Sequence, residues 1–277
     1  MKRIAFDSET TGIKPGSRAV EMAAILFDED GVYDVFETLV NPGMPITQDA
    51  MFVHQITDEM VADAPSTRDA LISFFAWIES VGVTELVAHY ACFDTGVISW
   101  EAGRCGLALP EGLVVHDTCE MAKHLKATKN NKLQTLVEHY RLTLRGTPHR
   151  ALCDADACRQ YFTLAEKAGV PLSRVPWDHA GHNYAYTDAL PSELAALPDL
   201  VAAGAPLTFT YRDSKGAETE RTITPWGWYN QNDELYFNGL CHLRDRELRE
   251  SGAARKQGDA ERTFRADRVL AVMEAAA

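Results

Sequence analysis

The chain has 277 residues, of which 46% are hydrophobic and 24% are charged, which is typical of soluble globular proteins and excludes disordered, fibrous and disulfide-scaffold classes. This length favours two compact domains joined by a short linker. The formal net charge of −13 repels polyanions at long range, so any nucleic-acid site must depend on local features such as divalent cations.

The N-terminal segment MKRIAFDSETTG has a short apolar run interrupted by acids, unlike the longer apolar core of a signal peptide. No stretch approaches the length of a membrane-spanning helix. No two of the 6 cysteines have the two-residue spacing of zinc knuckles, which favours reduced thiols. We therefore expect a cytoplasmic protein with no membrane partner.

The first half of the chain is predicted to be an α/β domain with a mixed sheet flanked by helices. Three apolar segments around a DEDG turn indicate an antiparallel start, after which strand and helix alternate. The predicted strands are Lys2–Phe6, Ala19–Phe27, Val32–Val40, Glu85–His89 and Leu113–Val115. The predicted helices are Ser66–Ile78, one that begins after Asp94, Leu133–Tyr140 and Ala151–Ala168. This domain is expected to span residues 1–168.

The second half is predicted to be a linker followed by a mostly β domain. Residues 169–190 contain prolines, glycine and scattered aromatic residues without clear periodicity, which indicates a linker packed onto a surface. Residues 191–277 form the second predicted domain. Its predicted elements are a helix over Ser192–Ala203 and strands over Leu207–Tyr211, Thr219–Thr224, Glu234–Leu240 and Thr263–Met273.

Two acidic residues lie at the end of the first predicted strand. Asp7 and Glu9 are two positions apart, and because strand side chains repeat with period two, both carboxylates project from the same face. Phe6 and the TTG turn that follows place this pair at a sheet edge that opens onto a loop. The pair indicates a cation site, although a solvated strand end would have the same pattern.

Two later segments contain further candidates. Asp94 ends LVAHYACFD, where an apolar strand leads into a helix, so its carboxylate either joins the site or caps the helix. His149 and Asp154 lie in PHRALCDADA, where the histidine just precedes a helix. Asp154 and Asp156 point to nearly opposite sides of that helix, so we assign Asp154 to the site and Asp156 to the surface.

These residue types predict metal-dependent hydrolysis of phosphodiester bonds. Four carboxylates suit two hard cations, Mg²⁺ or Mn²⁺, rather than a tetrahedral zinc site. Two such cations roughly 3.5 to 4 Å apart would stabilise the attacking and leaving oxygens. Histidine titrates near neutrality in its unperturbed form, so His149 is the candidate base for the attacking water, although a lone histidine is more often structural.

The segments FDSETTG, HYACFD and HRALCDADA, in that order, resemble the three motifs of the DEDDh (DnaQ-like) exonucleases. The resemblance covers Met1 to Lys167 and includes VNPGMPITQDAMFVHQITDEM, which is similar to the substrate-proximal segment of that family. It implies a ribonuclease-H-like fold and hydrolysis from the 3′ end to 5′-mononucleotides. It also makes Asp7, Glu9, Asp94 and Asp154 metal ligands and His149 the general base, in agreement with the assignment above.

The same resemblance implies contacts to the terminal nucleotide. The residues concerned are Thr10, Thr11, Gly12, His54 and Phe93. Gly12 would permit close backbone approach and Phe93 offers an apolar face, although core packing is an equally good role for this phenylalanine. Tyr90 departs from the family, in which asparagine is common after the histidine that matches His89.

The segment KHLKATKNNKL is the candidate phosphate-binding segment of the first domain. By the resemblance, its lysines lie near the substrate groove, where phosphates would pair with them. They are Lys123, Lys126, Lys129 and Lys132. A solvated basic face is an equally good interpretation.

The C-terminal segments PLTFTYRDSKGAETERTITPWGWY, ELYFNGLCHLRD and RTFRADRVLAV resemble a WYL domain. The resemblance implies a small SH3-like β-barrel that senses a ligand, often a nucleic acid. Leu235, Tyr236 and Phe237 occupy the motif that gives the domain its name, so its tryptophan is absent. The candidate contacts are Tyr236 as a stacking surface and the arginines Arg244, Arg246, Arg262, Arg265 and Arg268. A barrel whose charges pair locally and only brace the enzyme is the alternative.

We therefore expect a 3′-5′ exonuclease that acts on 3′ ends of single-stranded DNA or RNA, with DNA favoured, in a pathway such as DNA repair. The C-terminal domain would recruit or sense nucleic acid or another ligand. The alternative from another class is a nucleic-acid-responsive regulatory protein with an inactive exonuclease fold. The complete set of acids and histidine favours the enzyme.

Overall fold

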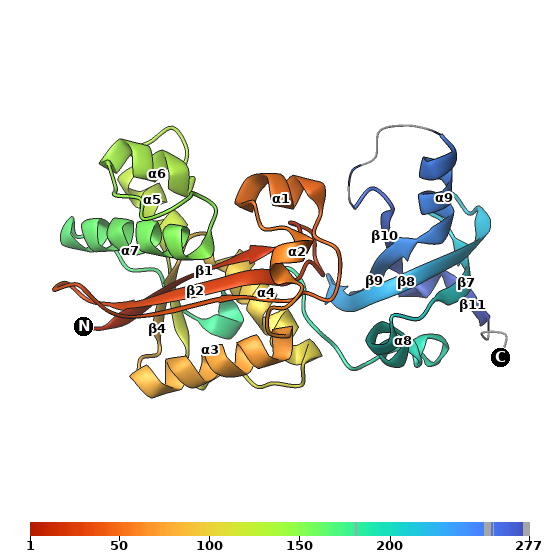
Figure 1. Ribbon diagram of the computed structural model, residues 1–277. Coiled ribbons are helices and arrows are strands. Elements are labelled where there is room, and N and C mark those ends of the chain that lie inside the picture. The colour runs from red at the N-terminus through yellow and green to blue at the C-terminus, as the bar shows by residue number, and fades with distance from the viewer. Residues whose placement is uncertain (181, 252–255, 257, 274–277) are drawn as a thin grey trace.

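The structure of the protein is a computed structural model that describes residues 1–180, 182–251, 256 and 258–273. Two units lie side by side, each built on its own sheet, and the chain passes from the first to the second near residue 190 (Figure 1). Among the described residues, no helix has the length and apolar character needed to cross a membrane.

The N-terminal unit contains a six-stranded mixed sheet of order β3-β2-β1-β4-β5-β6. Its strands are β1 Arg3–Thr10, β2 Ala19–Phe27, β3 Val32–Leu39, β4 Glu85–Ala88, β5 Val114–Asp117 and β6 Arg174–Pro176. β1, β2 and β3 pair antiparallel, and β1, β4 and β5 pair parallel. The mixed sheet predicted from the alternation of strand and helix is confirmed.

Helices cover both faces of this sheet because its central strands are apolar on both sides. The helices are α1 Gln48–His54, α2 Asp58–Val61, α3 Thr67–Val81, α4 Ala91–Arg104, α5 Thr118–Leu125, α6 Leu133–Tyr140 and α7 Ala151–Lys167. Ile4 and Phe6 of β1 belong to the core that includes α3 and α4, whereas Ala5 belongs to the core that includes α7. Figure 1 shows α3 and α7 on opposite sides of the sheet.

Two predicted boundaries at the site were wrong. β1 continues past Phe6 to Thr10, because the polar residues of DSET still form the ladder with β2. The fourth helix begins at Ala91 instead of after Asp94, with Tyr90 in the left-handed conformation as its N-cap. The acids of the first motif therefore lie within a paired strand, and Asp94 lies in the first turn of a helix.

The segment predicted as a linker over 169–190 packs onto the N-terminal unit along part of its length. β6 pairs antiparallel with β5 at the sheet edge. Trp177 is buried, its ring stacks on Phe6 with 5.4 Å between centroids, and its indole N–H donates a 2.7 Å hydrogen bond to Ser99 Oγ. The core of the first unit therefore includes residues beyond position 168.

The C-terminal unit contains a five-stranded antiparallel sheet of order β10-β9-β8-β7-β11. Its elements are α8 Leu197–Ala203, β7 Leu207–Arg212, β8 Glu218–Gln231, β9 Glu234–Cys241, α9 His242–Glu250, β10 Glu261–Arg265 and β11 Val269–Met273. Phe209, Phe237 and Trp228 lie in its core. Closure of this sheet into an SH3-like barrel stays a prediction.

Two predicted strands of this unit were also wrong in extent. The run from Thr263 to Met273 is interrupted by a 3₁₀ turn over Ala266–Arg268, because β10 pairs with β9 and β11 pairs with β7 at the other edge of the sheet. β8 continues to Gln231 through a bulge between Pro225 and Gly227, a position at which a strand tolerates proline.

Buried contacts join the two units. The indole N–H of Trp100, on α4, donates a 2.8 Å hydrogen bond to the carbonyl of Trp228 on β8. Arg18 is 5% exposed and donates to the carbonyls of Pro42 and Trp226, one from each unit. A Cβ on Gly227 would lie 3.1 Å from the Trp100 ring, so the approach is close. The C-terminal unit therefore has a defined position against the first.

Candidate active site

Three of the predicted metal ligands come together at one end of β1. Asp7 and Glu9 on β1 and Asp154 in the first turn of α7 offer carboxylate oxygens that all lie within 4.8 Å of one another. The alternating geometry of the strand directs the first two to one face, and α7 packs against β1 and β2. This arrangement gives three hard oxygen donors at one point.

Asp94, in the first turn of α4, lies beside this cluster and is held by Ser8 of β1. The backbone N–H and the hydroxyl of Ser8 both donate to Asp94 Oδ1, at 2.9 and 2.6 Å. Its carboxylate is buried, and it contributes to the repulsion felt by Asp7 and Glu9. Asp94 is not one of the carboxylates that meet within 4.8 Å of one another, so the structure brings three of the four predicted ligands to one point.

The cluster strongly disfavours its own full ionisation. Burial, reinforced by the neighbouring carboxylates, raises the pKa of Asp7 well above its usual range and the pKa of Glu9 to about 9. Burial raises the pKa of Asp94 to about 7, although hydrogen bonds from Ser8 lower it, and burial also raises the pKa of Asp154. Divalent cations would relieve this repulsion, so the donor set fits them.

His149 lies on the loop that precedes α7 and faces solvent. Its side chain is 53% exposed, its Nδ1 lies 3.8 Å from Asp154 Oδ2, and its backbone N–H donates to Asp154 Oδ1 at 3.3 Å. The backbone has a φ of 60°, which is uncommon for a residue with a Cβ. The loop thus presents an accessible imidazole next to a metal-ligand candidate.

A pair that the sequence analysis missed holds this loop in place. Arg150 Nε donates to both carboxylate oxygens of Glu21, at 3.0 Å each, and the backbone N–H of Ala151 donates to Glu21 Oε2 at 2.8 Å. Glu21 is 1% exposed and lies opposite Glu9 in the β1–β2 ladder. In the sequence, the signal for this pair is an acid, Glu21, in an otherwise apolar strand. That it lies opposite Glu9 becomes clear only when the register of β1 and β2 is known.

A cleft of 790 Å³ begins at the acidic cluster and is here called the nuclease cleft. Its lining includes Asp154, His149 and His89, together with Lys123 and Lys132. Two of the four predicted phosphate-binding lysines therefore face the site. The other two, Lys126 and Lys129, are not among the residues that line this cleft.

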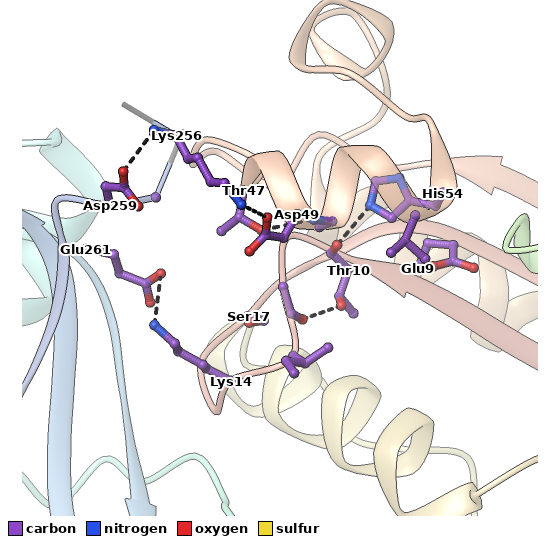
Figure 2. Close-up of a pocket in the computed structure, with 15 residues that line it drawn as sticks. Glu9, Thr10, Lys14, Ser17, Thr47, Asp49, His54, Lys256, Asp259 and Glu261 are labelled. Carbon is purple, nitrogen blue, oxygen red and sulfur yellow. Dashed lines mark hydrogen bonds and ion pairs between the residues drawn. The ribbon is translucent and has the colours of Figure 1, made fainter. Parts of the chain in front are cut away.

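Three of the five residues predicted to hold a terminal nucleotide lie at a second hollow, the inter-unit pocket of 470 Å³ (Figure 2). Thr10, Gly12 and His54 line it. Thr11 is buried, is not among the residues that line the pocket, and accepts a 3.0 Å hydrogen bond from Arg18 N–H. A Cβ on Gly12 would lie 3.3 Å from Ser17 Oγ. Their role in binding stays a prediction.

Two of these side chains have clear structural functions. His54 Nδ1 accepts from Ile56 N–H at 3.0 Å, so Nε2 donates to the Thr10 carbonyl at 3.2 Å, and both ring nitrogens are engaged. Phe93 is half-buried against the core below the sheet. His54 is also 2% exposed, so its ring is held inside the protein.

The assignment of Asp156 to the surface was wrong. The residue is 3% exposed, and its carboxylate accepts from Arg159 at 2.8 Å and from Gln160 at 2.9 Å. Helical geometry directs it away from Asp154, as expected, but the opposite side of α7 is covered by the chain around Arg145. This carboxylate therefore stabilises the unit and does not join the cluster.

In the C-terminal unit, several candidate ligand contacts are engaged within the protein. Arg265 pairs with Asp267 and with Glu234, each at 2.7 Å. Tyr236 also donates to Glu234, at 2.7 Å, and stacks on Tyr229. Arg262 donates to backbone carbonyls, and Arg244 lies 3.4 Å from Glu247. Arg268 lies at the turn before β11. A role of these residues in binding nucleic acid stays a prediction.

Comparison with known proteins extends over both units. The exonuclease family model RNase_T matches residues 4–162, and the WYL domain model matches residues 193–250. The DNA polymerase III subunit epsilon of Treponema pallidum is 34% identical over 163 residues, which are 57% of this chain and 74% of that protein. The PolC-type DNA polymerase III of Caldanaerobacter subterraneus is 35% identical over 161 residues, 57% of this chain. The chain spans only 11% of the length of that polymerase.

Among solved structures, E. coli exonuclease I in complex with an oligonucleotide is similar over 99% of this chain and 65% of its own, with a TM-score of 0.51 and 15% identity. At that identity the likeness shows the fold, which extends across both sheets. The motifs, the assembled carboxylates and the family model agree over the N-terminal unit. This chain belongs to the RNase_T exonuclease family, of the DEDDh (DnaQ-like) type, and has a WYL domain after its nuclease domain.

Proposed function

We propose that this protein is a 3′-5′ exonuclease that hydrolyses single-stranded nucleic acid, DNA in preference to RNA, to 5′-mononucleotides. The observation that supports this most is the cluster of Asp7, Glu9 and Asp154, whose oxygens lie within 4.8 Å of one another beside the nuclease cleft. The similarity to a DNA polymerase III epsilon subunit favours DNA as the substrate.

Two divalent cations, Mg²⁺ or Mn²⁺, are the proposed cofactors. Asp7, Glu9, Asp94 and Asp154 would hold them, because carboxylate oxygens are the ligands these cations prefer. Burial, and after it the neighbouring carboxylates, raises the pKa values of Asp7 and Glu9, and bound cations would favour their ionised forms. When bound, they would stabilise charge on the attacking and leaving oxygens of the phosphodiester.

His149 is the proposed general base. Its imidazole is accessible, lies on the rim of the nuclease cleft and is next to Asp154, so it can take a proton from a water molecule that attacks the terminal phosphodiester. The Arg150–Glu21 pair is a positioning element, because it fixes the backbone on one side of this histidine.

The substrate would lie along the nuclease cleft. Lys123 and Lys132 would pair with phosphates of the strand, and Lys123 would exchange its ion pair with Glu120 for a phosphate. Thr10, Thr11, Gly12, His54 and Phe93 are proposed to surround the terminal nucleotide. The C-terminal unit is proposed to sense nucleic acid or another ligand, with contacts from Tyr236, Arg244, Arg262, Arg265 and Arg268.

The test is digestion of 5′-labelled single-stranded DNA and RNA of one sequence, with Mg²⁺, with Mn²⁺ and with a chelator. We expect a ladder that shortens from the 3′ end only when a cation is present, with DNA cut faster. Intact strands in every reaction would refute the exonuclease and favour a binding protein with an inactive nuclease fold. Equal or faster cutting of RNA would refute the substrate preference alone.

A further inference from the structure

The inter-unit pocket contains residues from both units of the chain. Its N-terminal side is formed by the end of β1, the loop that follows it and α1, and its far side by Lys256, Gly258, Asp259 and Glu261 (Figure 2). Glu9 and His54 lie at one end of the view and the C-terminal residues at the other. A hollow of 470 Å³ has the size of a small-molecule site, whose volumes are about 300 to 1,000 Å³.

The chemistry of the pocket fits one nucleoside. Glu9 belongs to the acidic cluster at which the scissile phosphate would be held, so the sugar and base of the terminal nucleotide must extend away from it. Ile13, Ala50 and Val53 supply apolar surface, and a base offers an apolar π-face to such side chains. Ile13 is 88% exposed, so its side chain is available to a ligand.

The far wall is held against the nuclease domain by reciprocal contacts. Lys256 Nζ lies 2.9 Å from Asp49 Oδ1 on α1, and Lys14 Nζ lies 3.9 Å from Glu261 Oε2, so each unit contributes one cation and one anion. Gly258 has a φ of 92°, and a Cβ there would lie 2.9 Å from Thr47 Cγ2. Only glycine fits this approach without displacement of the wall.

We propose that the C-terminal unit completes the pocket for the 3′-terminal nucleoside, so that a domain outside the nuclease fold sets the affinity of the nuclease for the end of the strand. This inference depends on the proposed function. It assigns a binding role to Lys256, Gly258, Asp259 and Glu261 in addition to any ligand that the WYL domain senses elsewhere.

The first test displaces the wall with one methyl group. In Gly258→Ala the methyl meets Thr47, whereas in Gly216→Ala, a matched control with a φ of 86° in the same unit, nothing lies within 4 Å. We expect Gly258→Ala to weaken binding of deoxyadenosine 5′-monophosphate in Mg²⁺ and to raise KM for a single strand by about tenfold, with kcat changed less than KM. The affinity of the control for the nucleotide should differ from that of wild type by about twofold or less.

A second substitution, Thr47→Ser, tests whether Gly258→Ala acts by displacing the pocket wall or by general strain in the backbone. Thr47→Ser removes the methyl that meets the new side chain and keeps the hydroxyl that caps α1. In the Gly258→Ala background it should restore most of the nucleotide affinity. Affinity of Gly258→Ala equal to that of Gly216→Ala, with both proteins folded by thermal melting, would overturn the proposal.

A surface variant covers the case in which Gly258→Ala does not fold. Lys256→Glu changes a side chain that is 61% exposed, and Lys215→Glu in an exposed turn of the same unit makes the same change in net charge. We expect Lys256→Glu to bind the nucleotide at least about threefold more weakly than Lys215→Glu. If the two variants bind the nucleotide equally well and the wild-type protein cleaves the strand, the proposal for the pocket is overturned and the exonuclease assignment stands. If the wild-type protein does not cleave the strand, both are overturned.

Discussion

The guanidinium of Arg150 binds the buried carboxylate of Glu21, which lies directly across the β1–β2 ladder from Glu9. One ion pair thus connects the loop of the proposed base to the strand beside the proposed metal ligands. Because Glu21 is 1% exposed, removal of its partner leaves a buried charge uncompensated. The geometry of His149 therefore depends on the sheet as well as on its own loop.

We predict that Arg150→Ala lowers kcat by about 10- to 100-fold, because the loop that carries His149 loses its anchor and the base is displaced. KM should change less, since Arg150 is not among the residues that line the nuclease cleft. Steady-state kinetics on a 5′-labelled strand measure this, with Arg212→Ala, at an exposed position of β7 in the C-terminal unit, as the control. A rise in KM with kcat unchanged would instead make Arg150 a substrate contact.

We predict that His149→Ala lowers the rate of cleavage by about 10² to 10⁴-fold, the loss expected for a general base. Its Nδ1 is 3.8 Å from Asp154 but its ring is exposed, so cation affinity should change little. Isothermal titration with Mn²⁺ checks this. Loss of cation binding in the variant would make His149 a ligand and not the base.

We predict that the metal-free protein loses stability as pH rises. A carboxyl whose folded pKa is raised stabilises the fold below its unfolded pKa, and this contribution disappears as pH approaches the folded pKa. For Glu9 that window runs from its ordinary pKa of 4.5 to about 9. In chelator, Tm should therefore fall between pH 5 and pH 9.

The variant Glu9→Gln isolates this contribution. Its Tm in chelator should fall less steeply than that of wild type, and at pH 8 it should exceed it by several degrees, about 2 to 4 °C for each kcal/mol in a protein of this size. Added Mg²⁺ should stabilise wild type more than the variant. Parallel curves of Tm against pH for the two proteins would show that ionisation of Glu9 does not destabilise the fold.

We predict that truncation after Lys167 destabilises the nuclease domain. Such a cut removes β6 and the Trp177 ring that stacks on Phe6, and it also leaves the Trp100 indole without its acceptor on β8. The variant Trp177→Ala should cost about 3 to 5 kcal/mol in the full chain. Chemical denaturation measures both. A truncated protein as stable as the intact one would contradict this prediction, because neither β6 and Trp177 nor the contacts between the units would then stabilise the nuclease domain.

Much of the candidate site could be predicted from short sequence segments. Asp7 and Glu9 follow from the period of a strand, and the choice of Asp154 over Asp156 follows from the turn of a helix. Asp156 is buried all the same, because its partners Arg145 and Arg159 approach from a loop and from the next turn of the helix. The periodicity of a helix predicts the direction of each side chain, but it does not predict which other parts of the chain cover that side of the helix.

The relationship between the units could not be predicted. Trp100 and Trp228 are 128 positions apart, and no local pattern marks their hydrogen bond. The inter-unit pocket arises from the same docking, because Gly258 approaches Thr47 only once both sheets have formed. Long-range contacts of this kind depend on tertiary packing, which propensity and spacing do not encode.

The most direct test of the nuclease assignment compares Asp154→Asn with Asp156→Asn on a 5′-labelled single strand in Mg²⁺. The two acids lie two positions apart on α7, and only Asp154 shares the cluster with Asp7 and Glu9. We predict a 3′-shortened ladder for wild type and Asp156→Asn, and intact strand for Asp154→Asn, with all three proteins folded. Cleavage by Asp154→Asn at the wild-type rate would contradict the assignment of this cluster as the active site.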